Sequence, residues 1–183
     1  DVSLGVSVNI FRYLLFALLL GAVLVLSQST TGPDAGSKAP DISGRTLSGR
    51  VIQSAELSGK TIVVEFWATW CPACVSSLPA LQRFYEQHGD DPSLEVFAVH
   101  VPKGAVAPAI RNFCQKRGYS FPVILDSAAH LSMSFQIESI PTLVVIGPDG
   151  VVDRVKNGAL GGSPDDAAAR IKHWVDLASE PDT

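Results

Sequence analysis

Along most of the chain, short runs of apolar residues alternate with segments in which apolar residues recur every three or four positions. The run that follows the Gly59-Lys60 turn is almost wholly β-branched or apolar, which predicts a buried central strand. The last two runs are joined by Gly147-Pro148-Asp149-Gly150, a strong turn sequence. We expect strands or extended segments at five places: 61–66, 94–101, 123–125, 142–146 and 151–156.

Apolar residues recur every three or four positions between these runs, as in amphipathic helices. One helix is expected to follow Cys74, to bend at Pro79 and to end near Gly89. Ser163 has the residue type of an N-cap and precedes a proline and two acidic residues, so it predicts the start of the final helix. Two shorter helices are expected at 106–117 and 128–135.

Residues 41–58 carry two glycines and alternating apolar positions, which predict a short N-terminal β-hairpin. The order that follows is strand, helix, strand, helix, and then a hairpin and a closing helix. This order predicts an α/β sandwich in which a mixed central sheet is flanked by helices.

The N-terminal region differs in composition from the rest of the chain. Residues 13–26 are apolar or aromatic apart from Gly21, a length that suits a signal-peptide core and is short for a membrane span. Arg12 can snorkel, which favours an anchor, whereas Ser27-Gln28-Ser29 would serve as a cleavage site. Both interpretations export the domain. We therefore divide the chain into three parts: a membrane anchor or signal at 1–26, a flexible linker at 27–38 and the domain at 39–183.

Composition removes several classes of function. The chain has 183 residues, of which 46% are hydrophobic, enough for one packed domain. Its net charge is -4 and its 14 basic residues form no run, so we expect no nucleic-acid partner. Three cysteines are too few for a disulfide-stapled mini-protein, and one of them must lie outside any pair.

The segment Trp70-Cys71-Pro72-Ala73-Cys74 carries the candidate chemistry. Two cysteines three residues apart at a helix start share one face, where their sulfurs can close a disulfide or stand as a dithiol. The helix N-terminus lowers a thiol pKa, so Cys71 would attack and Cys74 would resolve the mixed disulfide. The alternative is a zinc or copper half-site, but a closed site needs more ligands, and the four histidines are dispersed.

Two other titratable residues lie in apolar surroundings. Glu65 shares a strand face with Val63 and Trp67, so it is either a buried carboxyl with a raised pKa or an edge residue in water. A buried carboxyl of that kind could accept and return a proton near neutral pH. Cys114 lies on the apolar side of its helix beside Ile110, which predicts a buried free thiol.

Several separated motifs resemble the thioredoxin superfamily. They are Val64 to Cys74, Pro79, Ile140-Pro141-Thr142, the Ala39-Pro40 opening and the glycine-rich turn at 147–150. Within the superfamily, residues 39–178 are most similar to the TlpA-type, ResA- and CcmG-like, membrane-anchored thiol-disulfide oxidoreductases. The resemblance implies a thioredoxin-like fold. It also implies a cis bond between Ile140 and Pro141, facing Cys71.

The resemblance also implies roles for individual residues. Thioredoxins carry an aspartate where this chain has Glu65, and glutamate there resembles the DsbA pattern, so Glu65 is expected to relay a proton for Cys74. We expect substrate proteins to bind at five residues: Trp70, Pro72, Ala73, Ile140 and Pro141. The Pro-Ala pair between the cysteines is closer to the CcmG and DsbA types than to thioredoxin. The absence of a histidine at position 73 favours a reductant.

We therefore predict an exported, membrane-tethered thiol-disulfide oxidoreductase that reduces client proteins in cytochrome c maturation or metal-site assembly. Its cofactor would be the Cys71–Cys74 disulfide alone, with no metal, and a membrane-embedded dithiol protein would supply electrons. The expected location is the bacterial inner membrane, with the catalytic domain in the periplasm; a soluble domain after signal cleavage is the alternative. Other functions left open are a copper(I) chaperone and a disulfide-forming oxidant. A peroxiredoxin is disfavoured because Ala68 stands where those enzymes have threonine.

Overall fold

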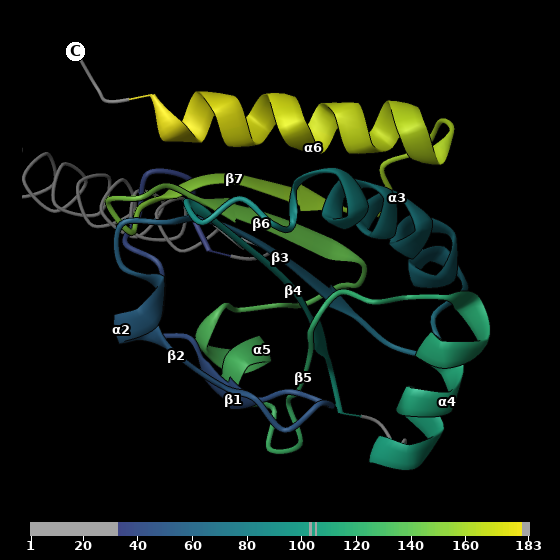
Figure 1. Cartoon of the computed structure of the whole chain (residues 1–183). Helices are drawn as coiled ribbons and strands as arrows, with labels where there is room; N and C mark the ends of the chain where they lie inside the picture. The colour runs from purple at the N-terminus through teal and green to yellow at the C-terminus, as the bar shows by residue number, and fades with distance from the viewer. Residues whose placement is uncertain (1–32, 103, 105, 181–183) are drawn as a thin grey trace, which may run out of the picture. The chain divides into compact units, whose positions relative to one another are not determined.

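The computed structural model describes residues 33–102, 104 and 106–180 (Figure 1). The expected anchor or signal at 1–26 and the first part of the linker lie outside these residues. No helix within the described ranges is long and apolar enough to span a membrane.

A five-stranded mixed sheet forms the centre of the fold, in the order β5-β4-β3-β6-β7 (Figure 1). The strand β3 is the middle one, parallel to β4 and antiparallel to β6. All its residues are buried, as expected for a strand with neighbours on both edges. The strands are β3 (Thr61–Trp67), β4 (Leu94–His100), β5 (Val123–Leu125), β6 (Thr142–Ile146) and β7 (Val152–Asn157).

The helices confirm the predicted segments and add one. They are α2 (Ser54–Leu57), α3 (Pro72–His88), α4 (Ala107–Arg117), α5 (His130–Ser134) and α6 (Pro164–Ser179). The added helix is α2, which the sequence does not predict because four residues are too few to show a helical period. The helix α5 begins two residues later than predicted, since Ala129 has a left-handed φ of 57°.

Local sequence explains where α6 begins and where α4 ends. The Ser163 hydroxyl accepts from the Asp166 backbone N–H, and the Asp166 carboxylate accepts from the Ser163 N–H, so the two residues close a capping box at the start of α6. Gly118 ends α4 with φ of 70°, a conformation that glycine adopts without a steric penalty.

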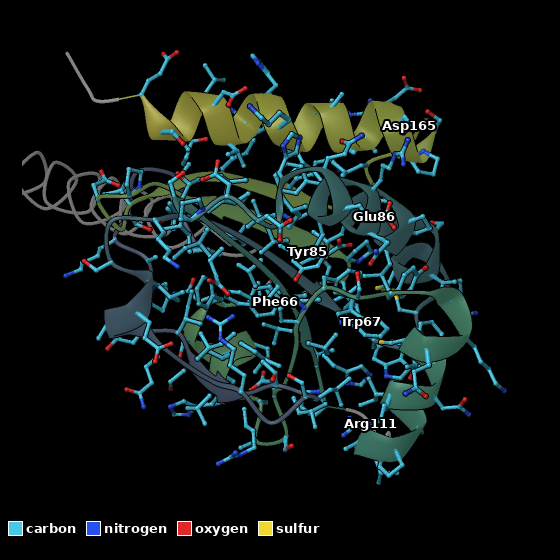
Figure 2. All side chains as sticks on the ribbon, viewed as in Figure 1. Phe66, Trp67, Tyr85, Glu86, Arg111 and Asp165 are labelled. Atoms are coloured by element: carbon cyan, nitrogen blue, oxygen red, sulfur yellow. A yellow bond between two sulfur atoms is a disulfide. The ribbon has the colours of Figure 1, made fainter. Side chains whose placement is uncertain are left out.

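Each face of the sheet packs against a separate layer. On one face lie α3, α4 and α6 (Figure 1). Their apolar residues share a buried cluster with Val63 and Trp67 of β3. On the other face lie the β-hairpin, α2 and α5, whose buried residues pack against Val64 and Phe66. Arg83 of α3 forms exposed ion pairs with Asp165 of α6 at 2.6 Å and with Glu86 at 3.7 Å. Figure 2 labels these two acidic residues, on α6 and α3. The sheet therefore has a reactive-helix side and a hairpin side.

The predicted N-terminal hairpin is present as β1 (Ser43–Arg45) paired with β2 (Val51–Gln53). It lies against β5 so closely that a Cβ on Gly44 would clash with the Ile124 side chain. Arg50 also reaches across to the buried carboxylate of Glu95 at the start of β4, at 2.8 Å. Packing and one partly buried ion pair therefore join the hairpin to the sheet.

Backbone contacts to the sheet begin before Ala39, where we expected the domain to start. The N–H of Gly36 donates to Val152 at 2.7 Å, and the N–H of Val152 donates to Ser37 at 2.8 Å. Residues 36–38, which belong to the predicted linker, thus lie along the edge of the sheet.

Candidate active site

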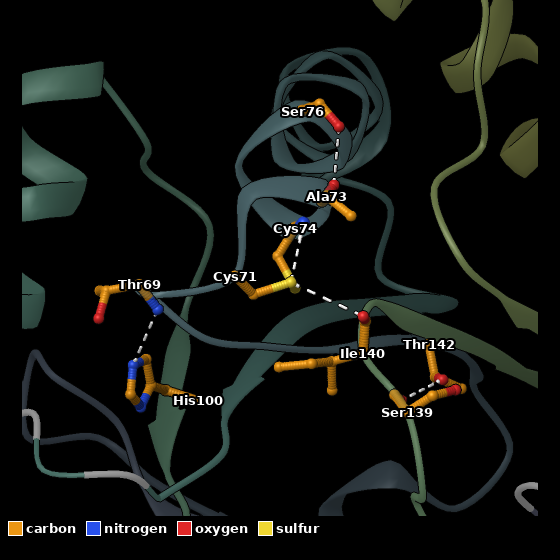
Figure 3. Close-up of a disulfide and its surroundings, with 9 residues drawn as sticks. All are labelled: Thr69, Cys71, Ala73, Cys74, Ser76, His100, Ser139, Ile140 and Thr142. Carbon is orange, nitrogen blue, oxygen red and sulfur yellow. Dashed lines mark hydrogen bonds between the residues drawn. A yellow bond between two sulfur atoms is a disulfide. The ribbon is translucent and has the colours of Figure 1, made fainter.

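The two cysteines of the C-x-x-C segment are joined by a disulfide at the start of α3 (Figure 3). Cys71 is the N-cap residue, and its sulfur accepts a hydrogen bond from the N–H of Cys74 at 3.1 Å. Pro72 suits the first helical position because that position needs no N–H donor. In the reduced protein, the same N–H and the helix N-terminus would stabilise a thiolate on Cys71.

The two sulfurs differ in their access to solvent. Cys71 is 6% exposed, whereas Cys74 is fully buried at 0%. A disulfide of a partner protein can therefore reach Cys71 but not Cys74. This difference agrees with the predicted division of labour, in which Cys71 attacks and Cys74 resolves.

The predicted binding residues surround Cys71. Trp70 is 47% exposed, and Pro72 and Ala73 are exposed at the start of α3. From the loop before β6, the carbonyl oxygen of Ile140 comes within 3.6 Å of the Cys71 sulfur (Figure 3). The Ile140–Pro141 bond is cis, as the resemblance implied.

A groove of about 240 Å³ opens beside this cluster. Most of its lining is apolar, and Glu138 is its one charged residue within the described part of the chain. Trp70 and Ile140 both line it, so the groove adjoins the reactive cysteine. Its lining includes Trp70, Val101, Pro102, Ile137, Glu138 and Ile140.

Glu65 lies on the interior strand β3 and is 1% exposed, so the buried alternative is confirmed and the edge alternative is wrong. Neither carboxylate oxygen makes a hydrogen bond within normal geometric limits. Loss of hydration raises the pKa of Glu65 to about 7, and the Ser77 hydroxyl partly opposes this rise. The carboxyl can therefore exchange a proton near neutral pH.

His100 contacts the active-site loop and is not among the site residues predicted from the sequence. Its Nε2 accepts a hydrogen bond from the backbone N–H of Thr69 at 3.3 Å, two residues before Cys71 (Figure 3). Its ring also stands nearly perpendicular to the Trp67 ring, with the centroids 5.1 Å apart. The available signal was a polar residue that ends an apolar strand, where active-site residues of α/β proteins gather.

The third cysteine is separate from this chemistry. Cys114 lies buried in α4 and has no disulfide partner among the described residues, which confirms the prediction of a buried free thiol. Burial raises the pKa of Cys114 to about 11, so its reactive thiolate is scarce at neutral pH. No group of three or more His, Cys, Asp or Glu in residues 33–102, 104 and 106–180 is placed to hold a metal ion.

Comparison with known proteins agrees with this geometry. Residues 34–171 match the family model described as Redoxin. Thiol-disulfide oxidoreductase ResA of Bacillus subtilis is 31% identical over 125 residues, which are 68% of this chain and 68% of that protein.

Two solved structures are similar along nearly their whole length. StoA from Bacillus subtilis has a TM-score of 0.64 and 26% identity, over 78% of this chain and 98% of that one. A thioredoxin-family thiol:disulfide interchange protein from Chlorobium tepidum TLS has a TM-score of 0.62 and 29% identity, over 78% of this chain and 99% of that one. The protein is thus a thiol-disulfide oxidoreductase that belongs to the Redoxin family, among the ResA-like, TlpA-type members of the thioredoxin superfamily.

Proposed function

We propose that this oxidoreductase works as a reductant of disulfides in exported client proteins. The observation that supports the exchange chemistry most is the position of Glu65, a buried carboxyl with a pKa of about 7 on the reactive-helix side of the sheet. The absence of a histidine at position 73 favours the reducing direction. A reductant must remove the proton from Cys74 before that thiol can attack. A carboxylate that is half ionised near neutral pH is suited to this step.

The reaction proceeds by two exchanges of a sulfur–sulfur bond. The Cys71 thiolate attacks one sulfur of the client disulfide, forms a mixed disulfide and expels the other client sulfur as a thiolate, which takes a proton from water. Cys74 then gives its proton to Glu65 and attacks the Cys71 sulfur, which releases the second client thiolate. That thiolate takes a proton from water, and Glu65 returns its own proton to water. The client gains two electrons and two protons overall, and the Cys71–Cys74 disulfide forms.

A second protein must return the enzyme to its dithiol form. If the domain is exported, that electron source lies across or within the membrane, and a membrane-embedded dithiol protein fits the requirement. Two features of the sequence support export, namely the apolar run at 13–26 and the single basic residue Arg12 before it. We place the catalytic domain in the periplasm, tethered to the inner membrane through this segment.

The clients we propose are proteins of cytochrome c maturation or of metal-site assembly, as the TlpA-type resemblance implies. Their cysteines would lie over Trp70, Pro72 and Ala73, and their backbone would run along Ile140 and Pro141. The N–H that Pro141 lacks leaves neighbouring backbone groups free to pair with an extended client segment.

Trapping of thiols in intact cells tests the direction of electron flow. Rapid acid quenching followed by alkylation should find Cys71 and Cys74 mostly as thiols. A mostly oxidised pair would reverse the assignment and make the protein an oxidant. The Cys74→Ala variant should accumulate mixed disulfides that identify the clients, whereas Cys71→Ser should capture none.

A further inference from the structure

A short loop carries the reactive cysteine from the end of β3 to the start of α3. The N–H of Cys71 donates to the carbonyl of Ala68 at 3.2 Å, which closes this loop into a turn. The N–H of Thr69 points away from that turn and donates to Nε2 of His100 at 3.3 Å (Figure 3). A backbone hydrogen bond and a side-chain hydrogen bond thus both contribute to holding the loop.

The His100 ring is fixed from several sides. His100 is 3% exposed and pairs with Trp67 across the parallel strands β3 and β4. The Trp67 ring packs edge-on against it, so the imidazole has little freedom to turn away from Thr69. A buried ring in a fixed orientation can hold the loop more firmly than a surface side chain could.

Acceptance at Nε2 also fixes the protonation state of the ring. A nitrogen that accepts from an N–H carries no proton, so the ring proton lies on Nδ1. Burial lowers the pKa of His100, which favours this neutral form. The ring therefore adds no positive charge near the Cys71 sulfur, and any influence on the reaction must act through geometry.

We propose that His100 is a positioning residue of the exchange reaction, which holds Thr69 and thereby sets the Cys71 sulfur against the N–H of Cys74. The distance from that sulfur to the Cys74 nitrogen is 3.1 Å, within range for stabilising a thiolate. When the loop loosens, this contact lengthens on average and the thiolate loses part of its stabilisation. The competing interpretation is that His100 only fills space beside Trp67.

Three variants separate positioning from packing. His100→Phe keeps a flat ring beside Trp67 but removes the acceptor. His100→Gln places an amide oxygen near the position of Nε2 and can accept again from Thr69. Val99→Ala is the matched control, since Val99 is buried one position earlier in β4 and belongs to the cluster on the opposite face of the sheet.

The first measurement is the pKa of the Cys71 thiol in the reduced protein, from the pH dependence of its alkylation rate. We expect His100→Phe to raise this pKa by about half to one unit, which slows alkylation below the pKa about three- to tenfold. The second is amide exchange at Thr69 by NMR, which should accelerate at least about fivefold when a hydrogen bond of ordinary strength is lost. His100→Gln should restore most of both values, and Val99→Ala should change neither.

The proposal is overturned if His100→Phe matches Val99→Ala in both measurements, or if His100→Gln behaves like His100→Phe. If His100→Phe does not fold, the nitrogen chemical shifts of His100 in the unaltered protein decide the question, because a proton on Nε2 would rule out the contact with Thr69. None of these readouts requires a client or depends on the direction of electron flow. The proposal can therefore fail while the proposed reductase function stands, and the reverse is also true.

Discussion

The buried carboxyl of Glu65 should make the stability of the protein depend on pH in a specific direction. Its pKa is raised from 4.5 to about 7 in the folded protein because burial removes water from the carboxylate. The folded state therefore binds a proton more tightly than the unfolded state between these two values. The free energy of unfolding must fall as the pH rises through this window and become level above about pH 7.

The magnitude follows from the two pKa values. The difference between 4.5 and about 7 corresponds to a loss of about 3 kcal/mol in the free energy of unfolding from pH 4.5 to pH 8. Glu65→Gln abolishes the titration and keeps nearly the same volume. Its buried amide has a constant cost of about 1–3 kcal/mol if it finds no partner, and this cost does not vary with pH.

Urea unfolding of the oxidised protein at several pH values from 5 to 8.5 measures the effect. The quantity to compare is the difference in the free energy of unfolding between Glu65→Gln and the unaltered protein, since the contributions of the other titrating groups largely cancel in this difference. As the pH rises from 5 to 8, we expect the free energy of unfolding of Glu65→Gln to increase by about 2–3 kcal/mol relative to that of the unaltered protein. Two curves that run parallel across this range would refute the assignment of a raised pKa to Glu65.

Three further predictions concern individual side chains. Glu65→Gln should slow the release of mixed disulfides at pH 7 about tenfold or more, because the reaction loses a general base. The alkylation rate of Cys71 should stay unchanged, and an equal fall in the release rate and the alkylation rate would indicate that the substitution distorts the active site. Cys114 should resist alkylation in the native protein and react only after unfolding, and Cys114→Ser should keep full turnover, whereas lost turnover would give this thiol a functional role. Arg50→Ala should lower the free energy of unfolding by about 1 kcal/mol, because it removes the 2.8 Å partner of the buried Glu95 carboxylate, and an unchanged urea midpoint would contradict this.

The sequence predicts the helices and strands of this fold well where the hydrophobic pattern repeats within one segment. Five apolar runs and four helical stripes correspond to strands and helices because side-chain burial repeats along each segment. The helix α2 has only four residues and offers no such repeat. The late start of α5 depends on the backbone of Ala129, which no hydrophobic pattern records.

The candidate site also combines features that the sequence predicts with features that depend on distant parts of the chain. The spacing of Cys71 and Cys74 predicts their pairing because the two residues share one helical turn. The burial of Glu65 could not be decided from its own strand, since it depends on β4 and β6 as neighbours. The hydrogen bond from Thr69 to His100 joins positions 31 residues apart, and no local pattern relates them.

The complete burial of Cys74 has a consequence for the lifetime of client complexes. A small thiol from solution can reach the Cys71 sulfur but not its partner, so no adduct can become stranded on the inner sulfur. Release by Cys74 needs no second encounter, because its sulfur is already inside the protein, next to the bond that it must break. The rate of this step is therefore an intramolecular property of the enzyme, and free thiols can shorten a client complex only by adding a second route through the accessible Cys71 side.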